Sequence, residues 1–317
     1  MAGPAVMWRW LQPLAGAAVL AALGWKLGAG PFLDGLKAVN GQALAVAAAI
    51  TLATTVCCAL RWRLVARGLG LDIPVGGAVA AYYRSQFLNS VLPGGVLGDV
   101  HRGLKQGHEA GEAGRGLRAV VWERAAGQTV QLILAVGLLV FLPSPVHHVS
   151  AFLAVALLAV VSAVLGALHW RSAGGSQWWA RALRASAADL RSGLLTRSTC
   201  PGVVLASVAA VGGHTAIFLI AARTAGVTAP VGPLLPLAMV VLLAMSVPAN
   251  IAGWGPREGA AAWAFAAAGQ GAAQGVSAAV VYGVLSFVAC LPGAAVLAAG
   301  WVHSGRSRAE SRGAPHA

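Results

Sequence analysis

Long apolar stretches recur along the chain, each bounded by a short polar segment. Six of them are long enough to cross a hydrocarbon core about 30 Å thick as a helix that rises 1.5 Å per residue. They are residues 11–27, 43–60, 119–141, 149–169, 203–222 and 276–301. The pattern predicts an all-α fold: a polytopic transmembrane helical bundle in a single integral membrane domain, residues 1–302. A polar tail, residues 303–317, follows, and we expect it to be disordered and cytoplasmic.

Two further apolar segments are interrupted by proline and glycine. The first covers residues 76–92 and ends in a Pro-Gly-Gly turn at residues 93–99. The second covers residues 232–247, breaks at residues 248–256 and resumes over residues 257–268. If the first segment crossed the bilayer, the basic segment after it would lie outside, against the positive-inside rule. We therefore predict two re-entrant helical hairpins, which enter from opposite faces.

The two interrupted segments occupy corresponding positions in two halves of the chain, approximately residues 1–170 and 171–302. Gly95 and Gly253 are separated by half the length of the 317-residue chain. Interrupted segments placed in this way are typical of transporters built as inverted repeats, with the substrate site near the bilayer midplane. Non-helical backbone at membrane depth is tolerated where it is buried or lines a watery cavity. We therefore expect the two breaks to line a cavity.

Composition agrees with membrane embedding. Hydrophobic residues make up 58% of the chain and charged residues only 10%, whereas soluble domains carry about 25% charged residues. The mean hydropathy is +0.75. These values predict a multi-pass membrane protein, and frequent alanine, glycine and arginine indicate a GC-rich bacterial genome.

The net charge of +13 could indicate a nucleic-acid partner, but its distribution argues against one. The basic residues gather between apolar stretches, at Arg61, Arg63, Arg67, Arg102, Lys105, Arg115, Arg118, Arg171, Arg181, Arg184, Arg191 and Arg197. The positive-inside rule assigns such segments to the cytoplasm, and six crossings place both termini there as well. Residues 171–197 would be a helix on the cytoplasmic surface or a solvated basic loop.

The first hairpin carries a polar helical face that leads into its turn. Face and turn consist of Tyr82, Ser85, Gln86, Asn89, Pro93, Gly94 and Gly95. Asp99 and Arg102 follow at i, i+3 spacing, at which opposite charges can pair. They belong either to a substrate path or simply to the start of an interfacial helix, where Asp99 suits the positive end of the helix dipole.

The third crossing begins with charged and polar residues. Glu123, Gly127 and Gln131 share one stripe, with Arg124 and Gln128 on the adjoining one. A charge at mid-bilayer costs about 2.5–3.5 kcal/mol on insertion scales, so these side chains should face the interior and find partners. Alternatively, this is a helix end at the membrane surface, with Arg124 reaching toward the head groups.

In the second hairpin, Gly253, Gly255 and Pro256 precede Arg257 and Glu258. Proline is favoured in the first turn of a helix, so Arg257 and Glu258 should lie at a half-helix N-terminus, which attracts anions. This end could hold a lipid phosphate. Alternatively, Glu258 satisfies the helix end itself and pairs with Arg257.

No motif indicates an enzyme. The four cysteines lack Cys-x-x-Cys spacing, and the glycines match neither a dinucleotide fingerprint nor a P-loop. We therefore expect no catalytic residue, no metal site and no cofactor.

Taken together, these motifs resemble the lysylphosphatidylglycerol synthase transmembrane region, also called the flippase-like domain family. The motifs that carry the resemblance are Asn89-Ser90-Val91-Leu92-Pro93-Gly94-Gly95, Gly98-Asp99, Arg102, Glu123-Arg124 with Gly127, and Gly253-Trp254-Gly255-Pro256-Arg257-Glu258-Gly259. The resemblance covers residues 11–301. It implies a protein of the bacterial inner (plasma) membrane that is related to the lipid-flipping half of bacterial multiple peptide resistance factors, which moves aminoacylated phosphatidylglycerol between leaflets. No soluble aminoacyltransferase segment follows Trp301, so we expect no lipid aminoacylation. The chain also has Leu97 at a position where the family often has a second glycine before Asp99.

We therefore expect a transporter that moves an anionic or zwitterionic phospholipid, or a polyprenyl-linked lipid, between leaflets. Its expected partners are the lipid and the bilayer, together with a second copy of the chain or a membrane enzyme. The residues expected to bind the head group are Asn89, Pro93, Gly94, Gly95, Asp99, Arg102, Glu123, Arg124, Gly253, Gly255, Arg257 and Glu258. The alternatives are a polyprenyl diphosphate phosphatase-like enzyme and a noncatalytic accessory subunit of a membrane glycosyltransferase.

Overall fold

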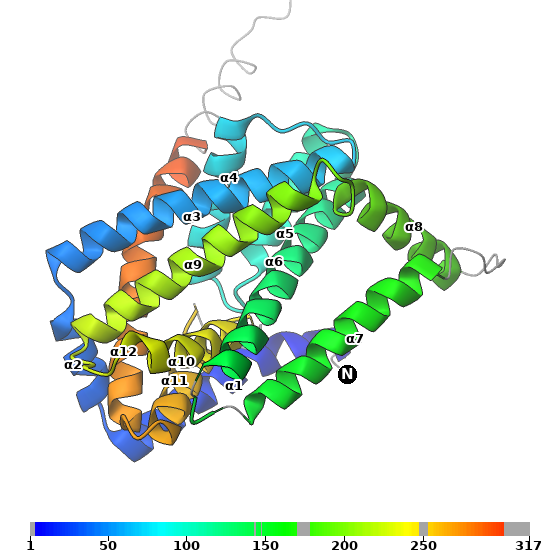
Figure 1. Ribbon diagram of the computed structural model, residues 1–317. Coiled ribbons are helices and arrows are strands. Elements are labelled where there is room, and N and C mark those ends of the chain that lie inside the picture. Colours follow the sequence, from blue (N-terminus) through cyan, green and yellow to red (C-terminus); the bar gives the residue numbers. More distant parts are fainter. Residues whose placement is uncertain (1–3, 143, 147, 170–177, 247–252, 301–317) are drawn as a thin grey trace, which may run out of the picture.

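The computed structural model describes residues 4–142, 144–146, 148–169, 178–246 and 253–300. Every regular element in these ranges is a helix, which confirms the predicted all-α class (Figure 1). Arg171, the tail at residues 303–317 and most of the second predicted break, residues 248–252, lie outside the described residues.

The first half of the chain contains seven helices among the described residues. They are α1 (Pro4–Leu27), α2 (Gly30–Ala38), α3 (Gly41–Gly68), α4 (Val75–Val91), α5 (Leu97–Glu109), α6 (Ala113–Phe141) and α7 (Val149–His169). The axis bends by 100° between α1 and α2. Gly28 adopts a positive φ of 72° at this bend, a conformation that favours glycine.

The second half contributes five helices. They are α8 (Trp178–Gly193), α9 (Cys200–Thr224), α10 (Val231–Ala244), α11 (Pro256–Ala267) and α12 (Ala272–Cys290). Helix α8 lies within the basic segment predicted to form either a surface helix or a loop. The chain continues as a helix beyond α12, so that residues Ala272–Gly300 form one long apolar rod.

Four helices are long and apolar enough to cross a membrane: α3, α6, α9 and the rod Ala272–Gly300. The bent pair α1 and α2 would make a fifth. The apolar part of α7 with described side chains, Val149–Val164, and α10 are shorter. The fold is therefore that of a multi-pass membrane protein with four or five membrane-capable helices among the described residues.

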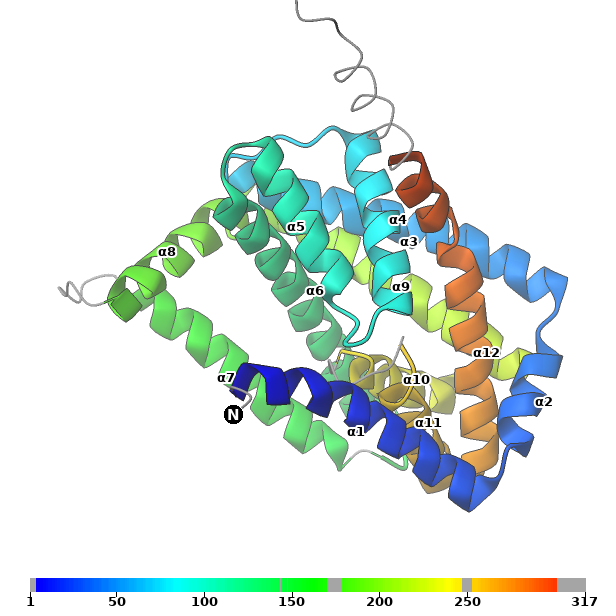
Figure 2. The ribbon, with the colours of Figure 1, turned by 180° about the vertical axis from the view of Figure 1, so that it is seen from behind.

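The two hairpins approach each other inside the bundle. Helices α4 and α5 descend from the end of the molecule where α3 finishes and α6 begins, and their connecting turn lies near the middle (Figure 2). Helices α10 and α11 occupy the opposite end, where α9 finishes and α12 begins (Figures 1 and 2). Each half thus has a long helix, a pair of short helices joined at a break, and a second long helix. These are α3, α4 with α5, and α6 in the first half, and α9, α10 with α11, and α12 in the second.

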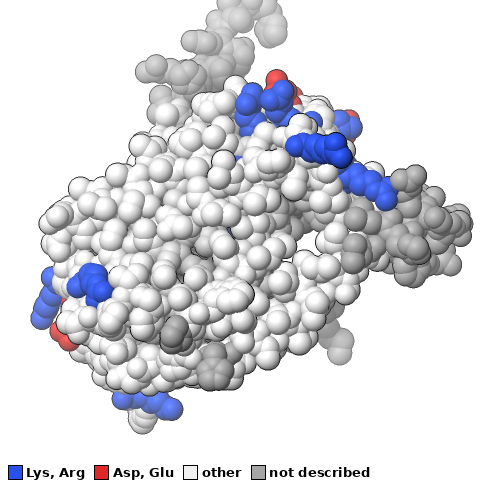
Figure 3. Space-filling model, in the orientation of Figure 1, with Lys and Arg blue, Asp and Glu red and all other residues white. Residues whose placement is uncertain are grey.

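Charged side chains gather at the two ends of the molecule and leave an uncharged belt between them (Figure 3). One end carries the final turn of α3 with Arg67, the end of α5 with Lys105, and the start of α6 with Arg115. The other carries fewer charges, among them Lys37 in the last turn of α2 and Arg223 in that of α9. We call the first the basic end.

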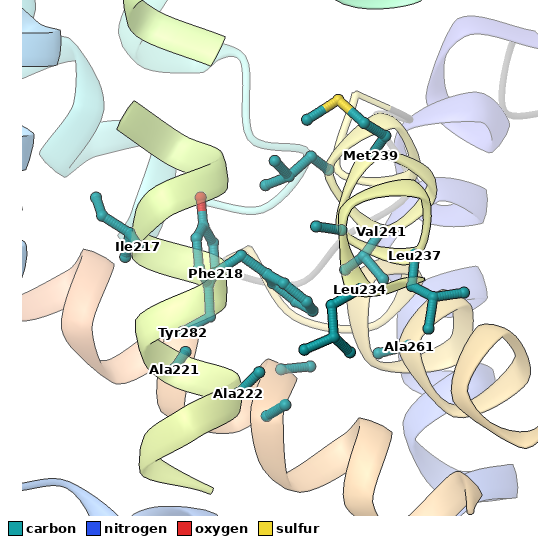
Figure 4. Close-up of a cluster of buried hydrophobic side chains, with 14 of the residues drawn as sticks. Ile217, Phe218, Ala221, Ala222, Leu234, Leu237, Met239, Val241, Ala261 and Tyr282 are labelled. Atoms are coloured by element: carbon teal, nitrogen blue, oxygen red, sulfur yellow. The ribbon is translucent and has the colours of Figure 1, made fainter. Parts of the chain in front are cut away.

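A tightly packed apolar core joins α9, α10, α11 and α12. Phe218 and Tyr282 are almost wholly buried, with ring centroids 5.8 Å apart, and Leu234 and Leu237 lie opposite them (Figure 4). Burying such side chains stabilises a fold by ~1.5–3 kcal/mol each in water. Inside a bilayer the gain comes instead from close packing. This core supports the second hairpin, because Leu234 and Leu237 of α10 and Ala261 of α11 belong to it.

Candidate functional site

A cavity of about 290 Å³ lies between the two hairpins in the middle of the bundle. Gly95 of the first break and Gly253 of the second both line it, which confirms the prediction that the breaks line a cavity. We call it the central cavity. Gly94 and Gly95 adopt φ values of 85° and 63°, so the Pro-Gly-Gly turn depends on glycine.

Polar side chains from both halves line the central cavity. They include Thr51, Gln86, Asn89, Ser90, Arg124, His214, Arg257 and Tyr282. A second space of about 210 Å³ shares Arg124, His214 and Tyr282 with it, and continues along α6 past Gln128 and Gln131. The polar stripe predicted on the third crossing therefore borders this extension.

Beside the cavity, Glu123 forms the centre of a buried ionic cluster. Its side chain is fully buried and accepts hydrogen bonds from Arg61 Nε at 2.8 Å, Arg102 Nη2 at 3.0 Å and Tyr82 Oη at 3.2 Å. Arg61 also donates to Ser207 Oγ at 3.2 Å. Glu123 thus faces the interior and finds partners, as a charge at membrane depth requires.

Asp99 forms the second acidic centre of the cluster. It accepts hydrogen bonds from Ser85 Oγ at 2.9 Å, Asn89 Nδ2 at 2.8 Å and Arg102 Nη2 at 2.9 Å, and it pairs with Arg124. The predicted Asp99–Arg102 ion pair is therefore present. Asn89 also accepts a hydrogen bond from the Gly98 amide at 2.8 Å, which ties α4 to the start of α5.

Cations outnumber anions in this cluster. Three guanidinium groups, those of Arg61, Arg102 and Arg124, meet two carboxylates, those of Glu123 and Asp99. The excess positive charge lies toward the central cavity, because Arg124 lines this cavity and its side chain is 42% exposed. The Arg124 Nε has no hydrogen-bond partner among the described residues.

Aromatic rings enclose the buried arginines. The Arg102 guanidinium carbon lies 4.4 Å from the ring centroid of Trp62 and 4.3 Å from that of Tyr82. In the second half, Arg257 lies 4.9 Å from Trp254 and 5.7 Å from Tyr282. Cation–π contacts of this kind stabilise a guanidinium group most strongly where water is excluded.

The second hairpin begins α11 with Glu258 folded back on the helix end. Its carboxylate accepts a hydrogen bond from the Gly255 amide at 2.7 Å and from Arg257 Nε at 2.8 Å. The alternative in which Glu258 satisfies the helix end and pairs with Arg257 is therefore the arrangement observed. Gly255 has a φ of 118°, and a Cβ there would lie 2.8 Å from the Gly16 Cα of α1.

The structure divides the predicted site residues into three groups. Asn89, Gly95, Arg124, Gly253 and Arg257 line the central cavity. Asp99, Arg102, Glu123 and Glu258 are buried and absent from its wall. Asp99 pairs with the lining Arg124 and Glu258 with the lining Arg257, while Arg102 and Glu123 pair with each other. The remaining predicted residues, Pro93, Gly94 and Gly255, shape the turns and are absent from its wall.

Sequence analysis missed one central member of the cluster. It ended the second crossing at residue 60 and placed Arg61 in a basic loop, but α3 continues to Gly68 and Arg61 is only 7% exposed. That placement was wrong because Glu123 and Ser207 supply Arg61 with partners inside the bundle. A signal was present: Arg61 shares a buried helix face with Cys58 and Thr54, at i−3 and i−7.

Tyr282 and His214 were also absent from the predicted site. Tyr282 Oη lies 3.3 Å from His214 Nδ1, and both side chains line the central cavity. Their helices read as uniformly apolar crossings, and no neighbouring charge marks either residue in the sequence.

Comparison with known proteins gives one match. The family model described as the lysylphosphatidylglycerol synthase TM region matches residues 9–293. No curated protein and no solved structure matches the chain.

Proposed function

Since the chain belongs to the lysylphosphatidylglycerol synthase transmembrane region family, we propose that it moves a phosphate-bearing lipid between the leaflets of the bacterial inner membrane. The lipid would be an anionic or zwitterionic phospholipid or a polyprenyl-linked lipid. One observation carries the proposal: a polar cavity with excess guanidinium charge lies inside an otherwise apolar bundle. Arginine suits phosphate because its planar fork can donate two parallel hydrogen bonds.

The proposed topology has six crossings and two re-entrant hairpins, related as an inverted repeat, with both termini in the cytoplasm. The repeated order of helices supports it, as does an arginine enclosed by aromatic rings in each hairpin, Arg102 in the first and Arg257 in the second. The larger number of cations at the basic end supports its cytoplasmic placement.

In the proposed mechanism the head group leaves water and enters the central cavity, while the acyl chains stay in the hydrocarbon. Arg124 would bind the phosphate, because it lines the cavity and Asp99 is its only ion-pair partner among the described residues. Arg257, Asn89 and Gln86 would offer further donors along the wall. The sequence contains no ATP motif, so movement would be passive or coupled to an ion.

The proposal is tested by reconstituting the purified chain into liposomes that contain fluorescent phosphatidylglycerol, phosphatidylethanolamine or polyprenyl phosphate. We expect wild-type protein to accelerate exchange of at least one of these lipids. We expect Arg124→Gln to slow that exchange about tenfold or more, because a charge-assisted hydrogen bond contributes ~1.5–3 kcal/mol. No acceleration by correctly folded wild-type protein would contradict the proposal.

Arg115→Gln is the matched control. It makes the same charge change at the basic end, where Arg115 pairs only with the half-exposed Glu112 among the described residues, and exchange should remain at the wild-type rate. We propose that the lipid is moved without chemical change. Release of phosphate from a lipid diphosphate would instead indicate a phosphatase.

A further inference from the structure

A third cavity, of about 250 Å³, lies at the basic end and is separate from the central one. It is enclosed by the end of α3, the first half of α4 and the second half of α5. Small residues on α4, Gly77, Ala80 and Ala81, leave the space open. We call it the basic-end cavity.

Three residues that line the basic-end cavity carry buried donors without partners. Among the described residues, Arg102 Nε and Nη1, Trp62 Nε1 and Arg84 Nε are buried and have no hydrogen-bond partner. Arg102 and Trp62 are each only 1% exposed. Buried polar groups in folded proteins nearly always have a partner, so four unpaired donors around one space indicate an absent acceptor.

The charge of the wall selects the kind of acceptor. Arg84, Arg102 and Lys105 line the cavity with one carboxylate, that of Glu109. The Glu109 side chain is 56% exposed, and its Oε1 lies 3.9 Å from Lys105 Nζ. An ion pair this long and this exposed to solvent is weak, so Glu109 does not neutralise the positive charge of the wall. The wall is cationic and rich in N–H donors, and an oxyanion matches it in both respects.

We propose that the basic-end cavity binds a phosphate group, either that of an anionic lipid in the adjacent leaflet or free phosphate. Its role as a first binding site for the transported lipid rests on the proposed function. Arg102 connects the two cavities: it lines the basic-end cavity, and its Nη2 donates to Asp99, which pairs with Arg124 at the central cavity. A phosphate bound here would be two ion-pair contacts away from the central site.

The test measures binding of dioctanoyl phosphatidylglycerol and of inorganic phosphate to the purified full chain in detergent, by calorimetry. All titrations use the Arg124→Gln background, which weakens binding at the central cavity. We expect Arg84→Gln in this background to lower the affinity about tenfold or more, because it removes a charged donor. Arg67→Gln is the matched control: Arg67 is exposed at the same end and outside the cavity wall, so the affinity should not change.

A second variant tests the space rather than the charge. Ala81→Leu fills the basic-end cavity with apolar atoms and should abolish binding while the protein remains folded and monodisperse. Binding of the lipid alone assigns the site to a head group, and binding of inorganic phosphate as well assigns it to any phosphate; both support the site. No binding of either probe overturns it, and so does an affinity that neither Arg84→Gln nor Ala81→Leu lowers relative to the Arg124→Gln background.

The outcomes separate this inference from the proposed function. Intact binding by a chain that exchanges no lipid would contradict transport alone. If the wild-type protein exchanges lipid, but Arg84→Gln and Ala81→Leu leave the binding affinity unchanged, the basic-end site alone would be contradicted.

Discussion

At the scale of single residues, Glu123 is shared between two guanidinium groups. One oxygen accepts from Arg61 and Tyr82 and the other from Arg102, so a single fully buried carboxylate balances residues from α3, α4 and α5. A buried ion pair contributes little net stability while it is intact, but removal of one partner leaves an uncompensated charge. The cluster therefore fixes the position of its members more than it stabilises the fold.

Glu123→Gln should destabilise the protein strongly. The change removes the carboxylate that Arg61 pairs with and leaves Arg102 to share Asp99 with Arg124. Breaking a buried pair in this way costs ~3–5 kcal/mol. The thermal unfolding midpoint in detergent should fall by many degrees. Glu109→Gln, at a half-exposed position, should leave the midpoint unchanged, and equal midpoints for the two variants would contradict a structural role for the cluster.

Gly127→Ala should also destabilise, for a steric reason. A Cβ at this position would lie 2.6 Å from Arg61 Nη1, and Glu123 holds that guanidinium in place. Overpacking of this kind costs ~1–3 kcal/mol. Gly137→Ala is the control on the same helix: nothing lies within 4 Å of its Cβ, and the gain in helix propensity should raise the midpoint slightly.

Sequence reasoning succeeded for residues whose partners lie close along the chain. The spacing of Asp99 and Arg102 predicts their ion pair, and the stripe at Glu123 predicts an inward-facing charge. It failed for Arg61, whose partner Glu123 is 62 residues away. A one-dimensional pattern does not show which of several arginines near a helix end meets a buried acid across the bundle.

At the scale of elements, the first hairpin depends on close contact between α4 and α5. Gly98 lies against the Ser85 carbonyl oxygen, and its amide donates to Asn89 at 2.8 Å. Gly103 and Gly107 of α5 continue the same close approach toward α6, where they meet the backbone near Gly116. The helices α4, α5 and α6 therefore pack with their backbones in close contact, which only glycine allows at these positions.

Gly98→Ala should separate α4 from α5. Its Cβ would overlap the Ser85 carbonyl oxygen, and backbone cannot move aside as a flexible side chain can. We expect a loss of ~1–3 kcal/mol in stability and faster hydrogen exchange over residues 85–100. Gly76→Ala, on α4, is the control: its new Cβ meets nothing within 4 Å, and exchange should stay at the wild-type level.

The hairpins were predictable as elements because proline and glycine interrupt a helix through local chemistry alone. The short helix α2 was not predicted. Its nine residues, Gly30–Ala38, include Asp34 and Lys37, and they therefore resemble a polar connection between crossings. Its position depends on tertiary contact: Ser277 of α12 donates to the Pro31 carbonyl at 2.8 Å.

At the scale of the whole molecule, the charged ends and the uncharged belt define an axis, and the proposed orientation along it can be measured. We expect Ser198→Cys and Thr228→Cys, which flank the two ends of α9, to lie on opposite sides of the membrane. In a chain whose four cysteines are replaced by serine, an impermeable maleimide should label Thr228→Cys in intact cells. It should label Ser198→Cys only after permeabilisation. Labelling of both in intact cells, or the reverse pattern, would contradict the proposed topology.

Membrane embedding was predictable from composition and run length, because both report directly on burial in hydrocarbon. The meeting of the two breaks followed from their symmetrical placement in the sequence. The sequence did not indicate the basic-end cavity, which depends on how α3, α4 and α5 leave space around Trp62 and Arg84. No single residue in the sequence marks such a cavity, because it depends on the packing of three helices.

The small size of the central cavity has a consequence for the proposed transport when the lipids of the membrane change. In the proposed mechanism this space of about 290 Å³ would take up the head group while the fatty acids stay in the hydrocarbon, so we expect transport not to depend on fatty-acid length or unsaturation. A cell that remodels its fatty acids on cooling or warming changes the thickness and fluidity of the bilayer, but the chemistry at Arg124 stays the same. We therefore expect one form of this protein to serve the cell across its whole range of growth temperatures.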